Sequence, residues 1–192
     1  TTINGKKTDL YILKNKSGNE VAITNYGGAI QAIMIPDKNG NYANVIQGHD
    51  NINSVINSPE PYLSTLIGRY GNRISKGKFQ LNGKEYQLPI NNGPNSLHGG
   101  INGFNKKVWD ALMMNNETLI LNYVSSYGEE GYTGEVKVTV EYTFNDNNEL
   151  IIEYMATTNK KTIINLTSHG YFSLTGISDP TPTVDSLLCE IN

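Results

Sequence analysis

The sequence predicts an all-β protein that folds as a large antiparallel β-sandwich. Short runs rich in β-branched and aromatic residues alternate with clusters of Gly, Asn, Asp and Pro, as expected for successive strands joined by turns. From Val136 to Val140 the valines alternate with polar residues, so one face of that segment is apolar and the other is polar. No window of a dozen residues carries the 3.6-residue period of a helix. At 192 residues the length suits one such domain, and we expect it to comprise residues 1–192.

The expected strands follow one another along the chain. In order they are 9–14, 20–24, 29–35, 45–48, 108–114, 118–125, 135–144 and 149–158. The polar, proline-containing segment 50–61 predicts a long loop with at most one helical turn. Within 78–88, Asn82-Gly83 lies between alternating apolar residues and predicts a hairpin, because a type I′ turn needs positive φ at both central positions.

The last expected strand, 186–191, is cut off at Asn192. We therefore expect the sandwich to be incomplete in this chain and truncated at its C-terminus. An unpaired strand edge exposes backbone donors and acceptors, so we also expect this strand to pair with another chain. The chain starts at Thr1 without a methionine, which indicates a processed or trimmed N-terminus and leaves the cellular compartment undetermined.

Composition excludes several classes of partner. The net charge is -3 and 17% of residues are charged, so the chain has no basic footprint for nucleic acid, and a small neutral or weakly polar partner suits it better. No apolar run approaches the roughly 20 residues of a membrane span. The single cysteine, Cys189, rules out an internal disulfide and a thiolate metal site, and we expect it to be a small buried hydrophobe.

Polar side chains suited to a ligand concentrate in two segments on either side of the expected hairpin. The first, 68–74, contains Asn72 and Arg73, and the second, 91–100, contains His98. Arg and Asn offer several donors or a donor beside an acceptor, and glycines let backbone approach a ligand closely. This composition predicts a site for a polar ligand.

A third segment, 162–174, places His169 between a strand-like run and aromatic residues, where it could project from a sheet into a cleft. His49 carries no motif, and we expect it in a loop or on the surface. No two of the three histidines have the spacing of metal ligands and no acidic residue joins them in a short segment, so we expect no metal site.

Four motifs in this order resemble those of the aldose 1-epimerases, the galactose mutarotases. They read GRYGNRI at 68–74, NNGPNSLHGG at 91–100, GFNKKVW at 103–109 and NLTSHGYF at 165–172. The resemblance extends from about Lys6 to the last residue. It implies a large β-sandwich, galactose mutarotase-like, that interconverts the α and β anomers of free hexoses such as galactose and glucose without a metal or organic cofactor.

By that resemblance His169 is the general acid that protonates the ring oxygen, and His98 hydrogen-bonds the sugar beside it. Arg73 and Asn72 would hold ring hydroxyls, each of which needs a partner once water is expelled. The residues that could form an apolar surface for the sugar ring, among which the sequence does not decide, are Tyr70, Phe104, Trp109 and Phe172.

The chain departs from the family pattern at a few positions. Gly71 stands where the family commonly has alanine, and Ser168, Gly170 and Ser173 replace residues often seen as Asn, Thr or Ser, and Asn, respectively. Arg69 could as well be a structural partner of a buried carboxylate or carbonyl, and Arg73 ranks above it on the family pattern alone.

The resemblance places the family's catalytic glutamate and a substrate-binding aspartate beyond the end of this chain. We therefore expect the chain alone to have little or no epimerase activity. Nothing in the sequence assigns the role of base to the free carboxylates Glu129, Glu130, Asp185 or Glu190, and Glu129-Glu130, in a Gly-rich turn, is expected at a solvated corner.

Two functions stay open. The chain is either the N-terminal portion of an aldose 1-epimerase, completed by a second chain or segment, or a non-catalytic carbohydrate-binding β-sandwich that retains the hydroxyl-binding residues. A third option, an epimerase of hexose 6-phosphates, requires basic residues at the cleft, for which Lys106-Lys107 alone is thin support.

Overall fold

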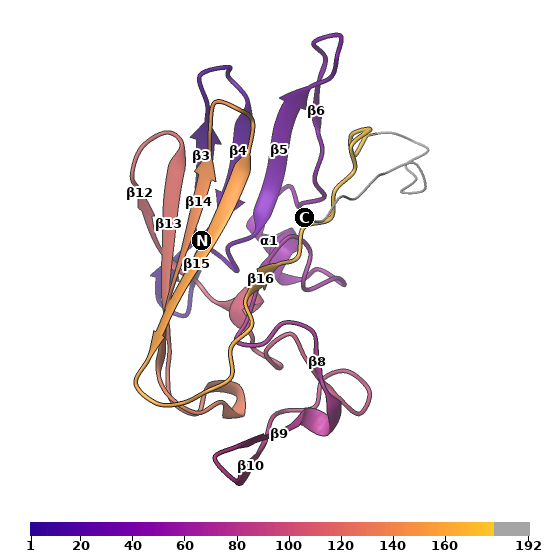
Figure 1. The fold of residues 1–192 in the computed structure, drawn as a ribbon. Coiled ribbons are helices and arrows are strands. Elements are labelled where there is room, and N and C mark those ends of the chain that lie inside the picture. Colours follow the sequence, from indigo (N-terminus) through magenta and orange to yellow (C-terminus); the bar gives the residue numbers. More distant parts are fainter. Residues whose placement is uncertain (179–192) are drawn as a thin grey trace.

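Two four-stranded antiparallel sheets face each other across an apolar layer in the computed structural model, which describes residues 1–178 (Figure 1). The first sheet has the order β3 (Leu10–Lys14), β4 (Glu20–Thr24), β5 (Ile30–Pro36), β6 (Tyr42–Asn44). The second has the order β12 (Asp110–Met113), β13 (Thr118–Ser125), β14 (Val136–Phe144), β15 (Leu150–Thr158). Both are simple meanders, because each strand pairs with its neighbour in sequence.

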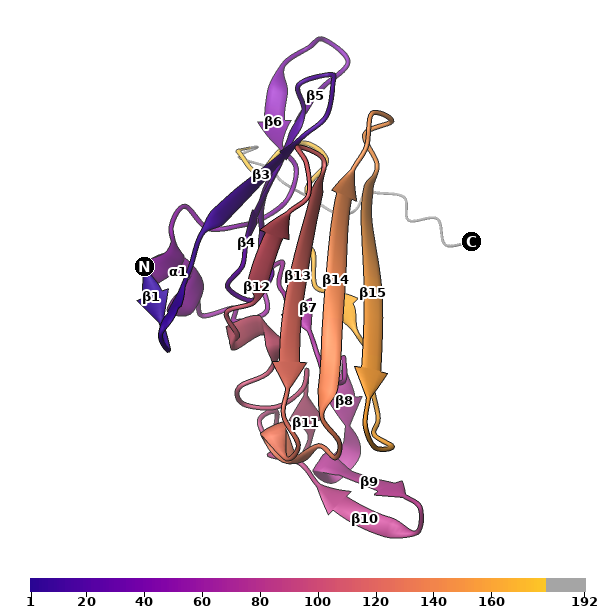
Figure 2. The ribbon, with the colours of Figure 1, turned by 90° about the vertical axis from the view of Figure 1, so that its left-hand side faces the viewer.

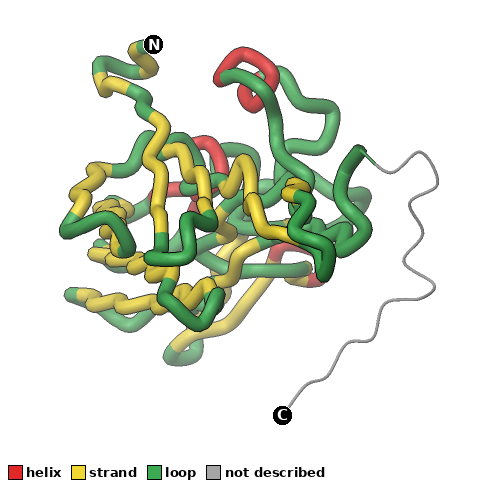
Figure 3. The backbone as a smooth tube through the Cα atoms, turned by 90° about the horizontal axis from the view of Figure 1, so that it is seen from above, coloured by secondary structure: helices red, strands yellow, loops and turns green. Residues whose placement is uncertain are grey.

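The remaining strands form two-stranded ribbons. These are β1 (Thr2–Ile3) with β2 (Lys6–Lys7), β7 (Leu66–Ile67) with β16 (Thr167–Ser168), β8 (Arg73–Ile74) with β11 (Ser96–Leu97), and β9 (Lys78–Leu81) with β10 (Lys84–Gln87). The helical segments are α1 (Ile52–Ile56) and the short 3₁₀-helices η1 (Ser75–Gly77), η2 (Phe104–Lys106) and η3 (Glu129–Gly131). Figure 3 shows these helical segments as short stretches within a trace made mainly of strands and loops.

The long hairpins of the second sheet follow from alternation and turn chemistry, and they stand side by side in Figure 2. On β14 the side chains that face the core are at most 2% exposed: Val136, Val138, Val140, Tyr142 and Phe144. The β14–β15 turn is held by Asn145, whose side-chain oxygen accepts hydrogen bonds from the backbone N–H groups of Asn147 and Glu149 at 2.9 and 3.1 Å. Such Asx turns hold the chain reversal and so help to fix the register of the strands.

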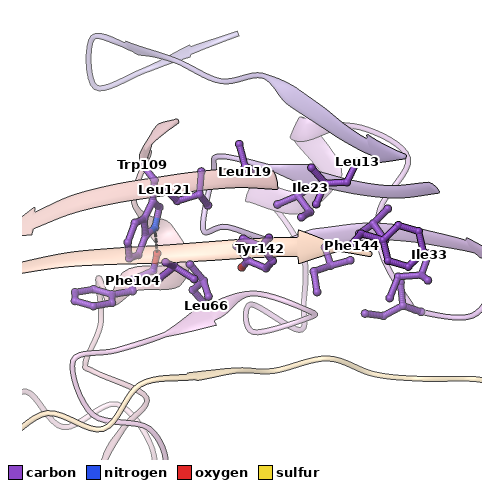
Figure 4. Close-up of a cluster of buried hydrophobic side chains, with 14 of the residues drawn as sticks. Leu13, Ile23, Ile33, Leu66, Phe104, Trp109, Leu119, Leu121, Tyr142 and Phe144 are labelled. Atoms are coloured by element: carbon purple, nitrogen blue, oxygen red, sulfur yellow. Dashed lines mark hydrogen bonds between the residues drawn. The ribbon is translucent and has the colours of Figure 1, made fainter. Parts of the chain in front are cut away.

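The core lies between the two sheets (Figure 4). Leu13, Ile23 and Ile33 of the first sheet meet Leu121 and Phe144 of the second, and each of these side chains is at most 7% exposed. Full burial of a side chain of this size contributes roughly 1.5–3 kcal/mol. Within this layer the Tyr142 hydroxyl donates a hydrogen bond to the Gly28 carbonyl at 2.8 Å. This bond joins β14 of the second sheet to the segment before β5 of the first, so it helps to hold the two sheets at a defined spacing.

Most sequence expectations for the elements are confirmed to within two residues, including the all-β class, the short helix in 50–61 and the hairpin at 78–88. Asn82 and Gly83 at its turn have φ of 52° and 75°. The expected strand 45–48 is wrong, since the strand is β6 and Ile46 makes only an isolated bridge with Phe172. The side-chain oxygen of Asn44 accepts from Ile33 N–H and Ile46 N–H at 2.9 and 3.2 Å, which replaces the regular ladder there.

The expected strand 186–191, with Cys189 and the carboxylates Asp185 and Glu190, lies outside the described residues. Among residues 1–178 no helix is long and apolar enough to cross a membrane. The same part of the chain contains no group of three or more His, Cys, Asp and Glu side chains arranged to hold a metal ion.

We expect Leu121→Ala to lower the free energy of unfolding by about 2–5 kcal/mol, because Leu121 is fully buried between the sheets and its truncation leaves a cavity. The matched control is Val124→Ala on the same strand, where Val124 is 50% exposed and the loss should stay within about 0.5 kcal/mol. Urea denaturation of both variants measures the difference. Equal losses would show that the sheet-to-sheet layer does not dominate stability.

Candidate functional site

An open groove of about 470 Å³ lies where the β7–β16 ribbon approaches the loop between β7 and β8. Three of the four sequence motifs meet there. The groove is lined by Gly71, Asn72, His98, Asn165, Leu166, Thr167, Ser168, His169 and Gly170. In Figures 1 and 2 the ribbons that carry these residues lie beside and beyond the sheets, toward the end where the β9–β10 hairpin projects. Residues far apart in sequence therefore share one polar surface.

His169 is held at the end of β16 by backbone pairing with the β7 segment. Its N–H donates to the Thr65 carbonyl at 2.9 Å, and its carbonyl accepts from Ser64 N–H at 3.0 Å. Its ring stacks on Tyr171, with centroids 5.1 Å apart and planes 28° apart. The backbone clamp and the stacked ring together restrict the direction in which the imidazole points.

His98 follows β11 and is clamped at two points by Asn72. The Asn72 N–H donates to His98 Nδ1 at 3.0 Å, and the His98 N–H donates to the Asn72 carbonyl at 3.2 Å. Both residues have left-handed backbone conformations, with φ of 52° for His98 and 67° for Asn72. Such a conformation is uncommon for histidine and is concentrated at functional sites. Because Nδ1 accepts a hydrogen bond, the proton of the neutral ring is on Nε2, which is thereby a donor.

The two imidazoles lie edge to face, with ring centroids 5.0 Å apart and planes at 90°. Tyr62 packs against both, at 4.7 Å from the His98 ring and 6.2 Å from the His169 ring. The pKa of His98 is lowered to about 4, chiefly by burial and in smaller part by the electrostatic influence of His169 and Arg73. At neutral pH His98 is therefore an uncharged hydrogen-bond donor.

Asn72 and Arg73 are solvent-exposed beside the imidazoles. The Asn72 side-chain oxygen accepts from Arg73 N–H at 2.9 Å and from Arg73 Nη1 at 3.3 Å, while Arg73 Nε donates to the Asn92 side-chain oxygen at 2.9 Å. These bonds leave Nη2 of the guanidinium with no protein acceptor among the described residues. The structure thus brings the four residues singled out in the sequence, His98, His169, Asn72 and Arg73, into one neighbourhood.

Sequence reasoning missed two residues that organise the site. Asn91 donates from its amide nitrogen to the carbonyls of Leu97 and Gly100 at 3.0 and 2.9 Å and accepts from Leu97 N–H at 2.7 Å, so it fixes the loop that carries His98. Its place in the second motif was the available signal. Tyr62 had none, because it lies in a proline-containing loop and reaches the imidazoles only through tertiary folding.

The structure separates the aromatic candidates for a sugar surface. Phe104 and Trp109 are each 1% exposed and belong to the core, where the Trp109 indole donates to the Phe104 carbonyl at 3.3 Å (Figure 4). Both are therefore unavailable to a ligand. Phe172 is 51% exposed and lines an adjoining, more apolar groove that shares Thr167, Ser168 and Gly170 with the groove of the histidines. Tyr70 is half-buried and lines neither groove.

The expectation of a solvated corner at Glu129-Glu130 is wrong for Glu129. Its side chain is 17% exposed, and it accepts hydrogen bonds from the Tyr123 hydroxyl at 2.6 Å and the Ser125 hydroxyl at 3.0 Å. The Lys107 ammonium lies 3.6 Å from the same carboxylate. Tertiary packing of η3 against the end of β13 buries this side chain, which the local sequence of the turn does not encode.

The basic pair Lys106-Lys107 is engaged outside the groove. Lys106 Nζ donates to the Ile101 carbonyl at 2.8 Å, Lys107 pairs with Glu129, and neither residue lines the groove.

None of the nine lining residues, all within 1–178, is a carboxylate. The carboxylate of Glu60 influences two aromatic residues near the groove electrostatically. Burial raises the pKa of the Tyr62 and Tyr171 hydroxyls, and the negative charge of Glu60 raises both pKa values further.

The groove therefore presents a neutral imidazole donor, a second imidazole and amide groups. The Arg73 guanidinium does not line the groove itself and is hydrogen-bonded to the lining residue Asn72. Neutral and charged donors at these spacings suit a ligand that carries several hydroxyls. The chain is therefore an antiparallel β-sandwich with a polar groove beside its sheets, an arrangement that can hold a small ligand through several hydrogen bonds.

Comparison with known proteins identifies the family. The family model described as Aldose 1-epimerase matches residues 9–192. The chain is 44% identical to a galactose mutarotase of Bos taurus over 160 residues, 83% of this chain and 46% of that protein. It is 32% identical to an aldose 1-epimerase of Escherichia coli over 178 residues, 90% of this chain and 49% of that protein. A solved structure of an aldose epimerase homologue from C. elegans superposes with a TM-score of 0.82 at 31% identity, covering 86% of this chain and 51% of that one.

This chain belongs to the aldose 1-epimerase family. Its strands match the antiparallel fold of galactose mutarotases, and it spans about half the length of the relatives it matches.

We expect the His98 imidazole to titrate near pH 4 in an NMR pH series, well below its ordinary value of 6.5. As pH falls, the His98 imidazole of the unfolded chain takes up a proton near pH 6.5, whereas the same imidazole in the folded chain is protonated only near pH 4. The free energy of unfolding should therefore fall as pH decreases through this window, by at most about 3.5 kcal/mol, since one pKa unit is worth about 1.4 kcal/mol. The variant His98→Gln should lose this part of the pH dependence. A His98 titration near 6.5 would contradict the buried, Asn72-bonded ring.

Proposed function

We propose that this chain supplies the sugar-binding groove and the acid group of an aldose 1-epimerase that interconverts the α and β anomers of free hexoses such as galactose and glucose. The observation that supports it most directly is the convergence of His98, His169 and Asn72 at one groove, with Arg73 hydrogen-bonded to Asn72. The named activities of the relatives support the reaction type.

The proposed reaction breaks and re-forms one bond, C1–O5, with two proton transfers in each direction. His169 gives a proton to the ring oxygen while a base takes the proton of the anomeric hydroxyl, so the C1–O5 bond breaks and the open-chain aldehyde forms. Rotation about C1–C2 presents the other face of the carbonyl, and the reverse proton transfers close the ring. No net proton is consumed, because each group regains its starting state once the ring has closed.

His98 has a different part in this scheme. Its pKa of about 4 makes it a poor proton carrier at neutral pH but a stable donor through Nε2. It can therefore hold a sugar oxygen beside His169 without competing for the transferred proton. Asn72 and the unused edge of Arg73 would bind vicinal hydroxyls, since a guanidinium presents several donors in one plane.

The base is proposed to come from outside residues 1–178, because no carboxylate is among the residues that line the groove. The same observation favours a second candidate function, a non-catalytic carbohydrate-binding β-sandwich. Both candidates share the groove and differ in whether a carboxylate reaches the anomeric hydroxyl.

Binding of D-galactose should perturb the imidazole signals of His98 and His169 in an NMR titration of the chain. Arg73→Met should weaken this binding by about tenfold, because a hydrogen bond from a charged donor contributes about 1.5–3 kcal/mol. Lys78→Ala is the matched control, since Lys78 is an exposed cation paired with Glu85 on the β9–β10 hairpin, away from the groove. Galactose binding that is equally strong in both variants would remove Arg73 from the site.

Polarimetry separates the two candidate functions. With this chain alone, α-D-galactose should mutarotate at the rate of buffer. With the C-terminal half of the bovine relative added in trans, a rate above buffer that His169→Gln abolishes would support the epimerase. Sugar binding without acceleration in either mixture would favour the non-catalytic protein, and acceleration by the chain alone would contradict the proposed origin of the base.

A further inference from the structure

The Arg69 guanidinium is the most deeply buried cation that the structure describes, and the scheme above gives it no part. Arg69 is 2% exposed. Its Nε donates to the Ser125 hydroxyl and its Nη1 to the Thr133 carbonyl, both at 2.8 Å. Its Nη2 donates to the carbonyls of Ser125 and Ser126, also at 2.8 Å. All four acceptors belong to the end of β13 and the connection to β14, so the side chain is fastened to the second sheet.

The backbone of Arg69 is fastened to the segment that carries His169. The Arg69 carbonyl accepts from Asn165 N–H at 2.8 Å, and the Asn165 carbonyl accepts from Gly71 N–H at 2.8 Å. Tyr70 and Asn165 form a parallel bridge between these bonds. His169 lies four residues beyond Asn165, so the register of its strand is set against Arg69.

The other imidazole depends on the same short segment. Asn72, three residues after Arg69, holds His98 through the two hydrogen bonds described above. Segment 69–72 therefore connects the Arg69 side chain, which is bonded to the end of the second sheet, with the residues that hold both imidazoles. Any displacement of Arg69 would move the amide that points at His98 Nδ1 relative to the strand of His169.

The positive charge of Arg69 is compensated by Glu129 through an intervening hydroxyl and not through a direct ion pair. The Ser125 hydroxyl accepts from Arg69 Nε and donates to a Glu129 oxygen at 3.0 Å, which links the buried cation to the half-buried carboxylate. The Tyr132 ring faces the guanidinium carbon at 5.7 Å. Burial lowers the pKa of Arg69, and Glu129 opposes that effect. Lysine cannot replace this group, because an ammonium lacks the planar fork of N–H donors that reaches the four acceptors.

We propose that Arg69 is a positioning residue of the site: by tying segment 69–72 to the end of the β13–β14 hairpin, it sets the placement of His98 relative to His169. The effect on sugar turnover rests on the proposed function, whereas the effect on the imidazoles does not. Arg69 does not line the groove and acts through Asn72 and Asn165.

The test compares Arg69→Lys with Leu121→Ala, a core variant that lowers stability away from the guanidinium. Two quantities are measured by NMR under conditions where each protein is folded: the pKa of His98 and the exchange protection of the Asn72 amide. Arg69→Lys should raise the His98 pKa by at least one unit above its value in the unmodified chain and reduce Asn72 protection at least tenfold. Leu121→Ala should leave the His98 pKa unchanged. Equal His98 titrations in the two variants would overturn the proposal.

Ser125→Ala provides a second variant should Arg69→Lys fail to fold. It removes the hydroxyl that links Arg69 Nε to Glu129 and keeps the three carbonyl acceptors. A shift of the His98 pKa in the same direction but smaller supports the proposal, and no shift overturns it. Galactose affinity, measured on the same samples, reports separately on the proposed function: an unmodified chain that binds no galactose argues against the sugar site, while the imidazole readouts still decide the role of Arg69.

Discussion

The apolar layer between the two four-stranded sheets is the interaction on which the rest of the structure depends. The groove residues lie on short ribbons and loops that have little stability of their own, since an isolated two-stranded ribbon is marginal in water. They acquire a fixed geometry because Leu66 on β7 is packed in that layer and Arg69 is bonded to the end of the second sheet. The polar site is thus built outward from the core.

Some polar groups near the groove are bonded to other parts of the protein, and others are free to bind a ligand. Arg69, Asn91 and the backbone of Asn72 are engaged by protein partners, while His98 and His169 line the groove. A ring whose second nitrogen is already occupied offers one defined proton to a ligand. The division explains how two histidines 5.0 Å apart can have different chemical roles in the proposed reaction.

Local patterns predicted the strands and the motifs well, and failed where long-range contacts decide. Alternation identified β14 because every second side chain from Val136 to Phe144 is buried, and it identified β13 because most of its inward side chains are buried as well. On β15 half-buried and exposed side chains alternate from Leu150 to Tyr154. The strand expected at 45–48 failed because one side chain, Asn44, takes two backbone donors out of the ladder. Glu129 was expected in solvent because the turn is rich in glycine, yet contacts with Tyr123 and Ser125 bury it. No local signal marked Tyr62.

By itself the sequence determined the all-β class, the turn positions and the family, because these depend on residue types and spacings along the chain. Only the tertiary structure decided that His98 is a neutral donor, that Phe104 and Trp109 are core residues, and that Arg69 is anchored in the sheet. These properties depend on burial and on hydrogen bonds between residues far apart in the chain, and such contacts exist only once the two sheets have packed together.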